Sequence, residues 1–140
     1  MDLPKTNLQR IYERKALGFN DKARTLGARG LITAEDLARK PLWCFYCDVG
    51  LGQSNSEFDH KIAFDRGGMN EPENIVRCCK DCNNRKFTKT PEEFKAYLDA
   101  RWECPQCGKQ FRPRYADWKR GYGTVCSRAC SGRRRWVVGR

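Results

Sequence analysis

Eight of the nine cysteines fall into four closely spaced pairs, and this spacing constrains the fold more than any other feature of the sequence. A Cys-x2-Cys pair makes a tight turn that directs two thiolates at one metal ion, and two such pairs complete a tetrahedral site. The first two pairs therefore predict one structural zinc ion, and the last two predict a second. The expected ligands are Cys44, Cys47, Cys79 and Cys82 for the first ion and Cys104, Cys107, Cys126 and Cys130 for the second.

The ninth cysteine, Cys78, leaves one ligand of the first site open, because Cys78 and Cys82 have a Cys-x3-Cys spacing that also suits a metal. Its other interpretation is a small buried apolar residue. Redox or disulfide use of the pairs is the alternative to zinc. Residues 1–5 are not followed by the apolar run of a secretion signal, and no stretch approaches membrane-spanning length. We therefore expect a reducing cytoplasm, where cysteine pairs favour metal.

Positive charge is concentrated at the end of the chain. The formal net charge is +11, and residues 104–140 carry ten Lys or Arg against Asp117 alone. Residues 41–103 carry nine Lys or Arg against eleven acids, and residues 1–40 carry nine against five. A basic tail beside a nearly neutral centre predicts a partner that is a polyanion, with a solvated basic surface as the alternative.

The segment between the first two cysteine pairs contains residues suited to phosphodiester hydrolysis. His60 is the only histidine of the chain, and a neutral imidazole suits the removal of a proton from an attacking water. An incidental surface histidine is the other interpretation. Asp59 and Asn83 offer oxygen ligands of the kind that Mg²⁺ prefers.

These residues resemble the HNH endonuclease family over residues 44–89. The elements occur in the family's order, as Asp59-His60, Gly67-Gly68, Asn74-Ile75, and a Cys-x2-Cys pair followed by Asn83. Asn83 replaces the final histidine of the family pattern, as it does in some relatives. The resemblance implies a ββα-metal core that hydrolyses DNA to 5′-phosphate and 3′-hydroxyl ends. It also implies one catalytic Mg²⁺ or Mn²⁺ on Asp59 and Asn83, and an Asn74 side chain that holds the loop carrying His60.

Basic residues in two places are predicted to contact DNA. Arg85 and Lys86 follow Cys82 on an expected helix, where a solvated helix face is the alternative. The tail resembles the small C-terminal zinc fingers of phage and bacterial HNH proteins, and its arginines alternate with aromatic residues that could stack on bases or form the core of the finger. The expected tail contacts are Arg112, Arg114, Lys119, Arg120, Arg133, Arg134 and Arg135.

The sequence thus predicts an α+β protein with three parts: a helical N-terminal segment (1–40), an HNH nuclease core (41–103) and a basic zinc finger (104–140). Within the first part, Thr33 is expected to cap a short helix that ends before Pro41. The expected function is that of a metal-dependent DNA endonuclease with no membrane or small-molecule partner. Alternatives are an inactive zinc-finger DNA-binding or regulatory protein and an RNA-binding protein.

Overall fold

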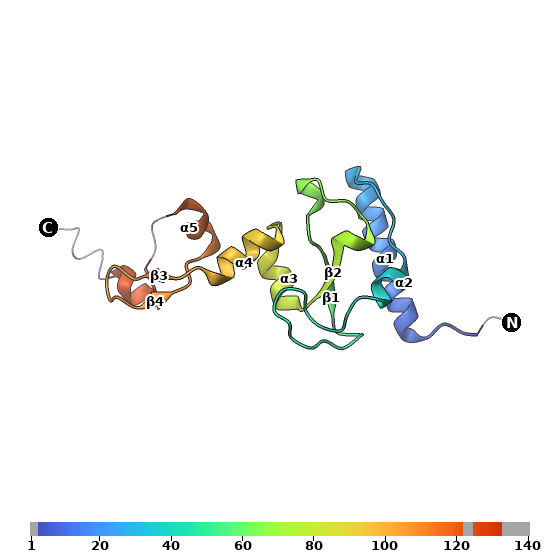
Figure 1. The fold of residues 1–140 in the computed structure, drawn as a ribbon, viewed down its shortest axis with the longest axis horizontal. Coiled ribbons are helices and arrows are strands. Elements are labelled where there is room, and N and C mark those ends of the chain that lie inside the picture. The colour runs from blue at the N-terminus through green and yellow to red at the C-terminus, as the bar shows by residue number, and fades with distance from the viewer. Residues whose placement is uncertain (1–2, 122–124, 133–140) are drawn as a thin grey trace. The chain divides into compact units, whose positions relative to one another are not determined.

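The computed structural model describes residues 3–121 and 125–132, and these divide into two compact units, Met1–Glu92 and Glu93–Arg140. Helices alternate with two small antiparallel sheets, which confirms the predicted α+β class (Figure 1). No described helix combines the length and the apolar character that a membrane span requires.

The first unit begins with a long helix, α1 (Asn7–Leu26). Thr6 and Gln9 form a reciprocal capping box at its start, and Gly27 ends it in the left-handed conformation. Helix α2 (Ala34–Ala38) follows, and Thr33 caps it as the sequence predicts, with Asp36 completing a capping box. The glycine within α1 does not interrupt the helix, because the helix is stabilised by packing rather than by propensity alone.

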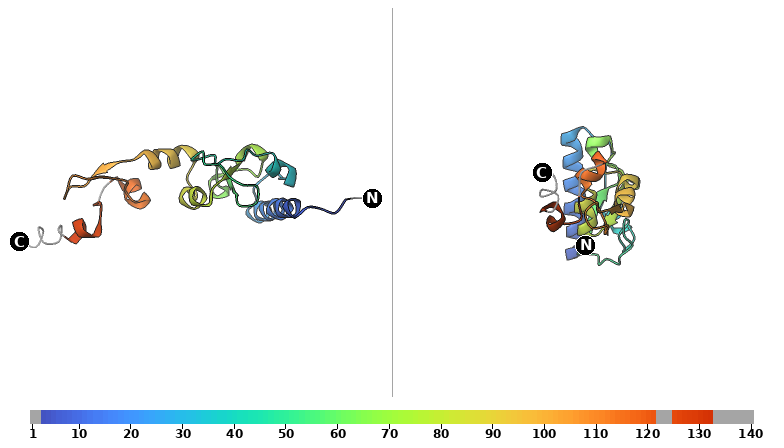
Figure 2. Two further views of the ribbon diagram at one scale, coloured as in Figure 1. Left: turned by 90° about the horizontal axis from the view of Figure 1, so that it is seen from below. Right: turned by 90° about the vertical axis from the view of Figure 1, so that its left-hand side faces the viewer.

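A two-stranded antiparallel sheet forms the centre of the first unit. Strands β1 (Glu57–His60) and β2 (Ile75–Cys78) pair so that Asp59 lies opposite Val76 and His60 opposite Ile75. Between them lie two short 3-10 helices, η1 (Phe64–Arg66) and η2 (Pro72–Asn74). Helix α3 (Lys80–Lys86) follows β2 directly. The hairpin formed by β1 and β2 lies between α1 and α3 (Figures 1 and 2).

The core of the first unit joins the N-terminal segment to this hairpin. Its buried members come from α1, α2, the loop between them and both strands: Tyr12, Ala16, Ile32, Leu37, Phe58 and Ile75. Arg77 of β2 is buried beside this core. Its guanidinium donates to the Tyr12 hydroxyl at 3.3 Å, to Ser56 Oγ at 2.5 Å and to the Leu37 carbonyl at 3.2 Å. Residues 1–40 are therefore an integral part of the unit that carries the hairpin.

The second unit contains most of α4 (Pro91–Asp99), then β3 (Trp102–Glu103), β4 (Gln110–Phe111) and α5 (Tyr115–Arg120). Trp102 pairs with Phe111 and Glu103 with Gln110. The compact unit begins at Glu93 and includes the segment 104–140 that the sequence predicts as a finger. The Tyr97 ring of α4 packs on the rings of Tyr115 and Trp118, with centroids 5.5 and 5.9 Å away.

Candidate active site

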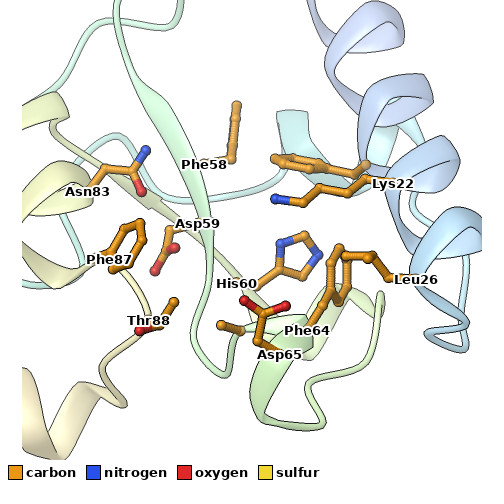
Figure 3. A pocket seen from close by; sticks show the side chains of 12 residues that line it. Lys22, Leu26, Phe58, Asp59, His60, Phe64, Asp65, Asn83, Phe87 and Thr88 are labelled. Atoms are coloured by element: carbon orange, nitrogen blue, oxygen red, sulfur yellow. The ribbon is translucent and has the colours of Figure 1, made fainter.

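Strand β1 and helix α3 bring three predicted site residues to one pocket of the first unit. Asp59 and His60 end β1, and Asn83 is on α3. All three line the pocket, with Lys22 of α1 forming part of its wall (Figure 3). The full lining is Phe19, Lys22, Leu26, Phe58, Asp59, His60, Ala63, Phe64, Asp65, Asn83, Phe87 and Thr88.

The Asp59 carboxylate is fixed by two donors on the same oxygen. Tyr46 donates its hydroxyl to Oδ2 at 2.5 Å, and Lys86 Nζ lies 2.9 Å from Oδ2. Burial and the hydrogen bond to Asp59 raise the pKa of Tyr46 well above its ordinary range, so the hydroxyl stays protonated and donates. Neither Asp59 Oδ1 nor the Asn83 side chain hydrogen-bonds to another residue in the described parts of the chain. Two oxygen donors thus remain available at the pocket, which fits a hard divalent ion.

The position of Lys86 contradicts the prediction that this residue contacts DNA. Its side chain is fully buried, pairs with Asp59 and donates to the His60 carbonyl at 3.0 Å. It is therefore not a surface contact for DNA phosphates; it holds the two residues at the end of β1 in place. Arg85, one position earlier, remains at the surface and pairs with Asp81 at 3.3 Å.

The His60 imidazole is 9% exposed and packs between two aromatic rings. The centroid of Phe19 lies 5.0 Å away and that of Phe64 lies 4.3 Å away. Burial lowers the pKa of His60, and its hydrogen bond with Asn70 opposes that shift. A lowered pKa keeps the ring neutral at neutral pH, which is the form that can accept a proton.

Asn74 lies outside the pocket and joins the two ends of the loop that follows His60. Its side chain accepts from the Ile62 N–H at 2.9 Å and donates to the carbonyls of Ile62 and Met69 at 3.0 and 2.8 Å. Gly68 packs so closely on this loop that a Cβ atom would collide with the Ile62 carbonyl, and Gly67 has a φ of +83°. The loop geometry therefore excludes a side chain at Gly68, favours glycine at position 67 and is held by Asn74.

The first cysteine set gathers beside α3. The Sγ atoms of Cys44, Cys47, Cys79 and Cys82 all lie within 4.8 Å of one another. Thiolates around a tetrahedral zinc ion lie about 3.8 Å apart, given Zn–S bonds of about 2.3 Å, so these four can hold one zinc ion. Cys78 belongs to neither cysteine set and is buried in β2, whereas Cys79 lies within the first set.

The second cysteine set gathers in the second unit. The Sγ atoms of Cys104, Cys107, Cys126 and Cys130 also lie within 4.8 Å of one another. Cys126 Sγ is 3.5 Å from that of Cys107 and 3.6 Å from that of Cys130. The donor set and its dimensions again fit one zinc ion.

The predicted DNA contacts of the tail lie on and around α5. Arg112 and Lys119 are exposed. Arg114 and Arg120 both pair with the buried Asp117, yet their side chains remain 81% and 56% exposed. The Tyr115 ring meets the Tyr97 ring edge-on, the Trp118 ring is tilted against it, and all three half-buried rings pack together within the unit. Arg133, Arg134 and Arg135 lie outside the described residues.

A comparison with known protein families identifies a matching family model. Residues 44–99 match the family model described as HNH endonuclease. The match confirms the resemblance seen in the sequence, and it spans the first cysteine set, both strands of the hairpin and α3. An HNH domain supports a nuclease-type function on a nucleic acid substrate. No curated protein matches the chain.

Several residues of the site were not found from the sequence. Asn70 contacts His60, Asn20 contacts Asn70, and Lys22 and Asp65 line the pocket. Asn20 and Lys22 precede the matched family segment and carry no spacing signal that relates them to His60. Only the three-dimensional packing of α1 against the hairpin brings them there.

Proposed function

We propose that this protein is a metal-dependent DNA endonuclease that hydrolyses phosphodiester bonds. The observation that carries the proposal is the convergence of Asp59, His60 and Asn83 on one pocket within the HNH segment. Hydrolysis needs a base near the attacking water and compensation for charge on the departing oxygen. The three side chains are of the types that serve these two purposes.

His60 acts in this proposal as the general base that removes a proton from the attacking water. Its ring is neutral because burial lowers its pKa, and the Phe19 and Phe64 rings restrict its orientation. Asn74 takes no part in the proton transfer. It positions the base through the loop from Ile62 to Met69.

Asp59 Oδ1 and the Asn83 amide oxygen would hold one Mg²⁺ or Mn²⁺ ion. When bound, such an ion stabilises the negative charge on the 3′ oxygen that leaves. Lys86 and Tyr46 fix the other carboxylate oxygen of Asp59 and so limit the directions in which Oδ1 can point. Figure 3 shows the Asn83 amide on the same side of the pocket as Asp59.

DNA would be held by cations at the pocket and on the finger. Lys22 is exposed on α1 and lines the pocket, so it can reach a phosphate there. Arg85 lies in the last turn of α3, and the exposed side chains of Arg112 and Lys119 are on the second unit. Contacts of this kind bind any DNA sequence, and their strength falls as salt rises.

A second function has one observation in its favour. Asp59 already pairs with the buried Lys86, and a lysine beside a carboxylate competes with a metal ion for it. An inactive centre would make the protein a zinc-dependent DNA-binding protein. Cleavage and binding assays separate these two functions.

The experiment is plasmid cleavage with Mg²⁺, Mn²⁺ or EDTA, using Asn83→Ala and a matched control. Asn84 adjoins Asn83 on α3 but is exposed and outside the pocket, so Asn84→Ala is the control. The endonuclease proposal expects Mg²⁺- or Mn²⁺-dependent cutting, a higher metal requirement for Asn83→Ala and parental behaviour for Asn84→Ala. Plasmid that is bound but stays supercoiled in every lane identifies the inactive binding protein.

A further inference from the structure

A chain of three buried or half-buried polar side chains runs from α1 to His60. Asn20 of α1 contacts Asn70, and Asn70 contacts His60 Nε2 at 3.0 Å. Asn70 is fully buried, and its own N–H donates to the Arg29 carbonyl at 2.7 Å. Polar groups in such a place are costly unless each donor meets an acceptor, so the directions of these hydrogen bonds are determined.

The backbone of Ile32 fixes the orientation of the Asn20 amide, and this orientation determines the donors and acceptors in the rest of the chain of hydrogen bonds. The Ile32 N–H donates to Asn20 Oδ1 at 2.9 Å, and Asn20 Nδ2 donates to the Ile32 carbonyl at 2.9 Å. A rotated Asn20 amide would place two donors together and two acceptors together. Because a backbone N–H can only donate and a carbonyl can only accept, Asn20 Oδ1 must face the Ile32 N–H.

The orientation of Asn20 in turn determines which atoms of Asn70 and His60 donate and accept. Asn20 Oδ1 can only accept, so Asn70 presents Nδ2 to it, at 2.8 Å. Asn70 Oδ1 is therefore the atom that faces His60 Nε2. An amide oxygen cannot donate, so Nε2 must carry the hydrogen when the imidazole is neutral. Nδ1 is left with its lone pair.

We propose that Asn20 and Asn70 are positioning residues that hold neutral His60 as the Nε2–H tautomer and leave Nδ1 to accept the proton from water. The inference deepens the proposed nuclease function and rests on it for the role of Nδ1. It also assigns a role in catalysis to α1, which lies outside the matched family segment. The Phe19 ring, from the same helix, restrains the ring that Asn70 orients.

The tautomer can be observed directly, because His60 is the only histidine of the chain. The full-length zinc-loaded protein is labelled with ¹⁵N-histidine, and long-range ¹H–¹⁵N correlation spectra are recorded at a pH where the ring is neutral. The expected spectrum has a protonated Nε2 and an unprotonated Nδ1. A protonated Nδ1 in the parent protein would overturn the proposal without the need for any variant.

Variants at Asn70 test the link to catalysis. Asn70→Leu removes the acceptor for Nε2–H, and we expect mixed tautomers and a fall of roughly ten- to a hundredfold in the single-turnover rate at saturating DNA, with unchanged DNA affinity. Asn70→Asp keeps an acceptor for Nε2–H but sets a second oxygen against Asn20 Oδ1, which can only accept, so we expect the Nε2–H tautomer with reduced stability. Asn20→Ala should shift the tautomer in the same direction as Asn70→Leu, while Asn84→Ala should not.

Two results separate the inference from the proposed function. A folded Asn70→Leu protein with the parental tautomer and rate would contradict the positioning role. A parent protein that does not cut DNA would contradict the proposed function and with it the role of Nδ1. The tautomer spectrum needs no cleavage, so it decides the orienting role of Asn20 and Asn70 by itself.

Discussion

Each of the two units contains a carboxylate held by basic side chains, but the buried partner differs. In the first unit the cation Lys86 is fully buried, and Asp59 keeps one oxygen free at a pocket. In the second unit Asp117 is buried, and the paired Arg114 and Arg120 remain exposed. The first arrangement orients a carboxylate at a pocket, whereas the second orients exposed cations around a buried carboxylate. This difference suits a catalytic unit and a unit that binds phosphates.

Loss of one zinc ligand from each unit should have the largest effect and should separate the units. The apparent binding free energy of structural zinc is about 10–16 kcal/mol in zinc-finger peptides. That figure matches the whole stability of a typical domain, about 5–15 kcal/mol. Cys44→Ser should therefore reduce the zinc content from two ions to one and abolish cleavage.

Cys104→Ser should also remove one zinc ion but leave the first unit folded, with its aromatic core around Tyr12 and Phe58 intact. Elemental analysis and hydrogen exchange, resolved by peptide, measure both effects. Protection lost throughout the chain after Cys104→Ser would show that the units do not fold independently.

Removal of the paired cation should cost more in the first unit than in the second. Lys86→Met leaves the Asp59 carboxylate without its buried cation, and breaking a buried pair typically costs about 3–5 kcal/mol. Arg114→Ala removes one partner of Asp117 but leaves Arg120 paired with the same carboxylate, so the loss should be smaller. Urea unfolding of the two variants checks the comparison. Equal losses of stability would remove the distinction between the two ion pairs.

Neutralisation of exposed cations on the second unit should change the salt dependence of DNA binding. Each phosphate contact contributes about 0.9 to the slope of log affinity against log salt, so Arg112→Ala with Lys119→Ala should reduce the slope by roughly 1.8. Lys95→Ala, on α4 of the same unit, is the control, because Lys95 pairs with Asp99 and lies outside the basic stretch. A slope that responds equally to the control would indicate a general charge effect rather than contacts by the finger.

The sequence was sufficient for features that depend on local spacing. The cysteine pairs, the Thr33–Asp36 capping box and the Asp59-His60 step each follow from residues a few positions apart. The spacing did not separate Cys78 from Cys79. In the structure Cys78 is the last, fully buried residue of β2, whereas Cys79 is the N-cap of α3 and lies in the cluster with Cys82.

Features that depend on distant packing were not predictable. Lys86 was expected at the surface, because a lysine on a short helix is usually solvated, and its burial depends on Asp59 lying opposite α3. Asn20 and Asn70 are fifty positions apart. No periodicity relates two such amides, and only the approach of α1 to the loop after β1 brings them together. Tyr97 likewise belongs with the finger because of ring contacts that local spacing does not encode.

The central claim is that His60 acts as the general base, and a single-turnover cleavage assay of His60→Ala tests it most directly. Zinc content, folding and DNA affinity serve as controls, because His60 belongs to neither cysteine set and its proposed role is confined to the transition state. The cleavage rate should fall by roughly 10²–10⁴-fold while these controls stay near the parental values. Since the chain has no second histidine, a His60→Ala protein that cuts DNA at the parental rate would contradict the mechanism.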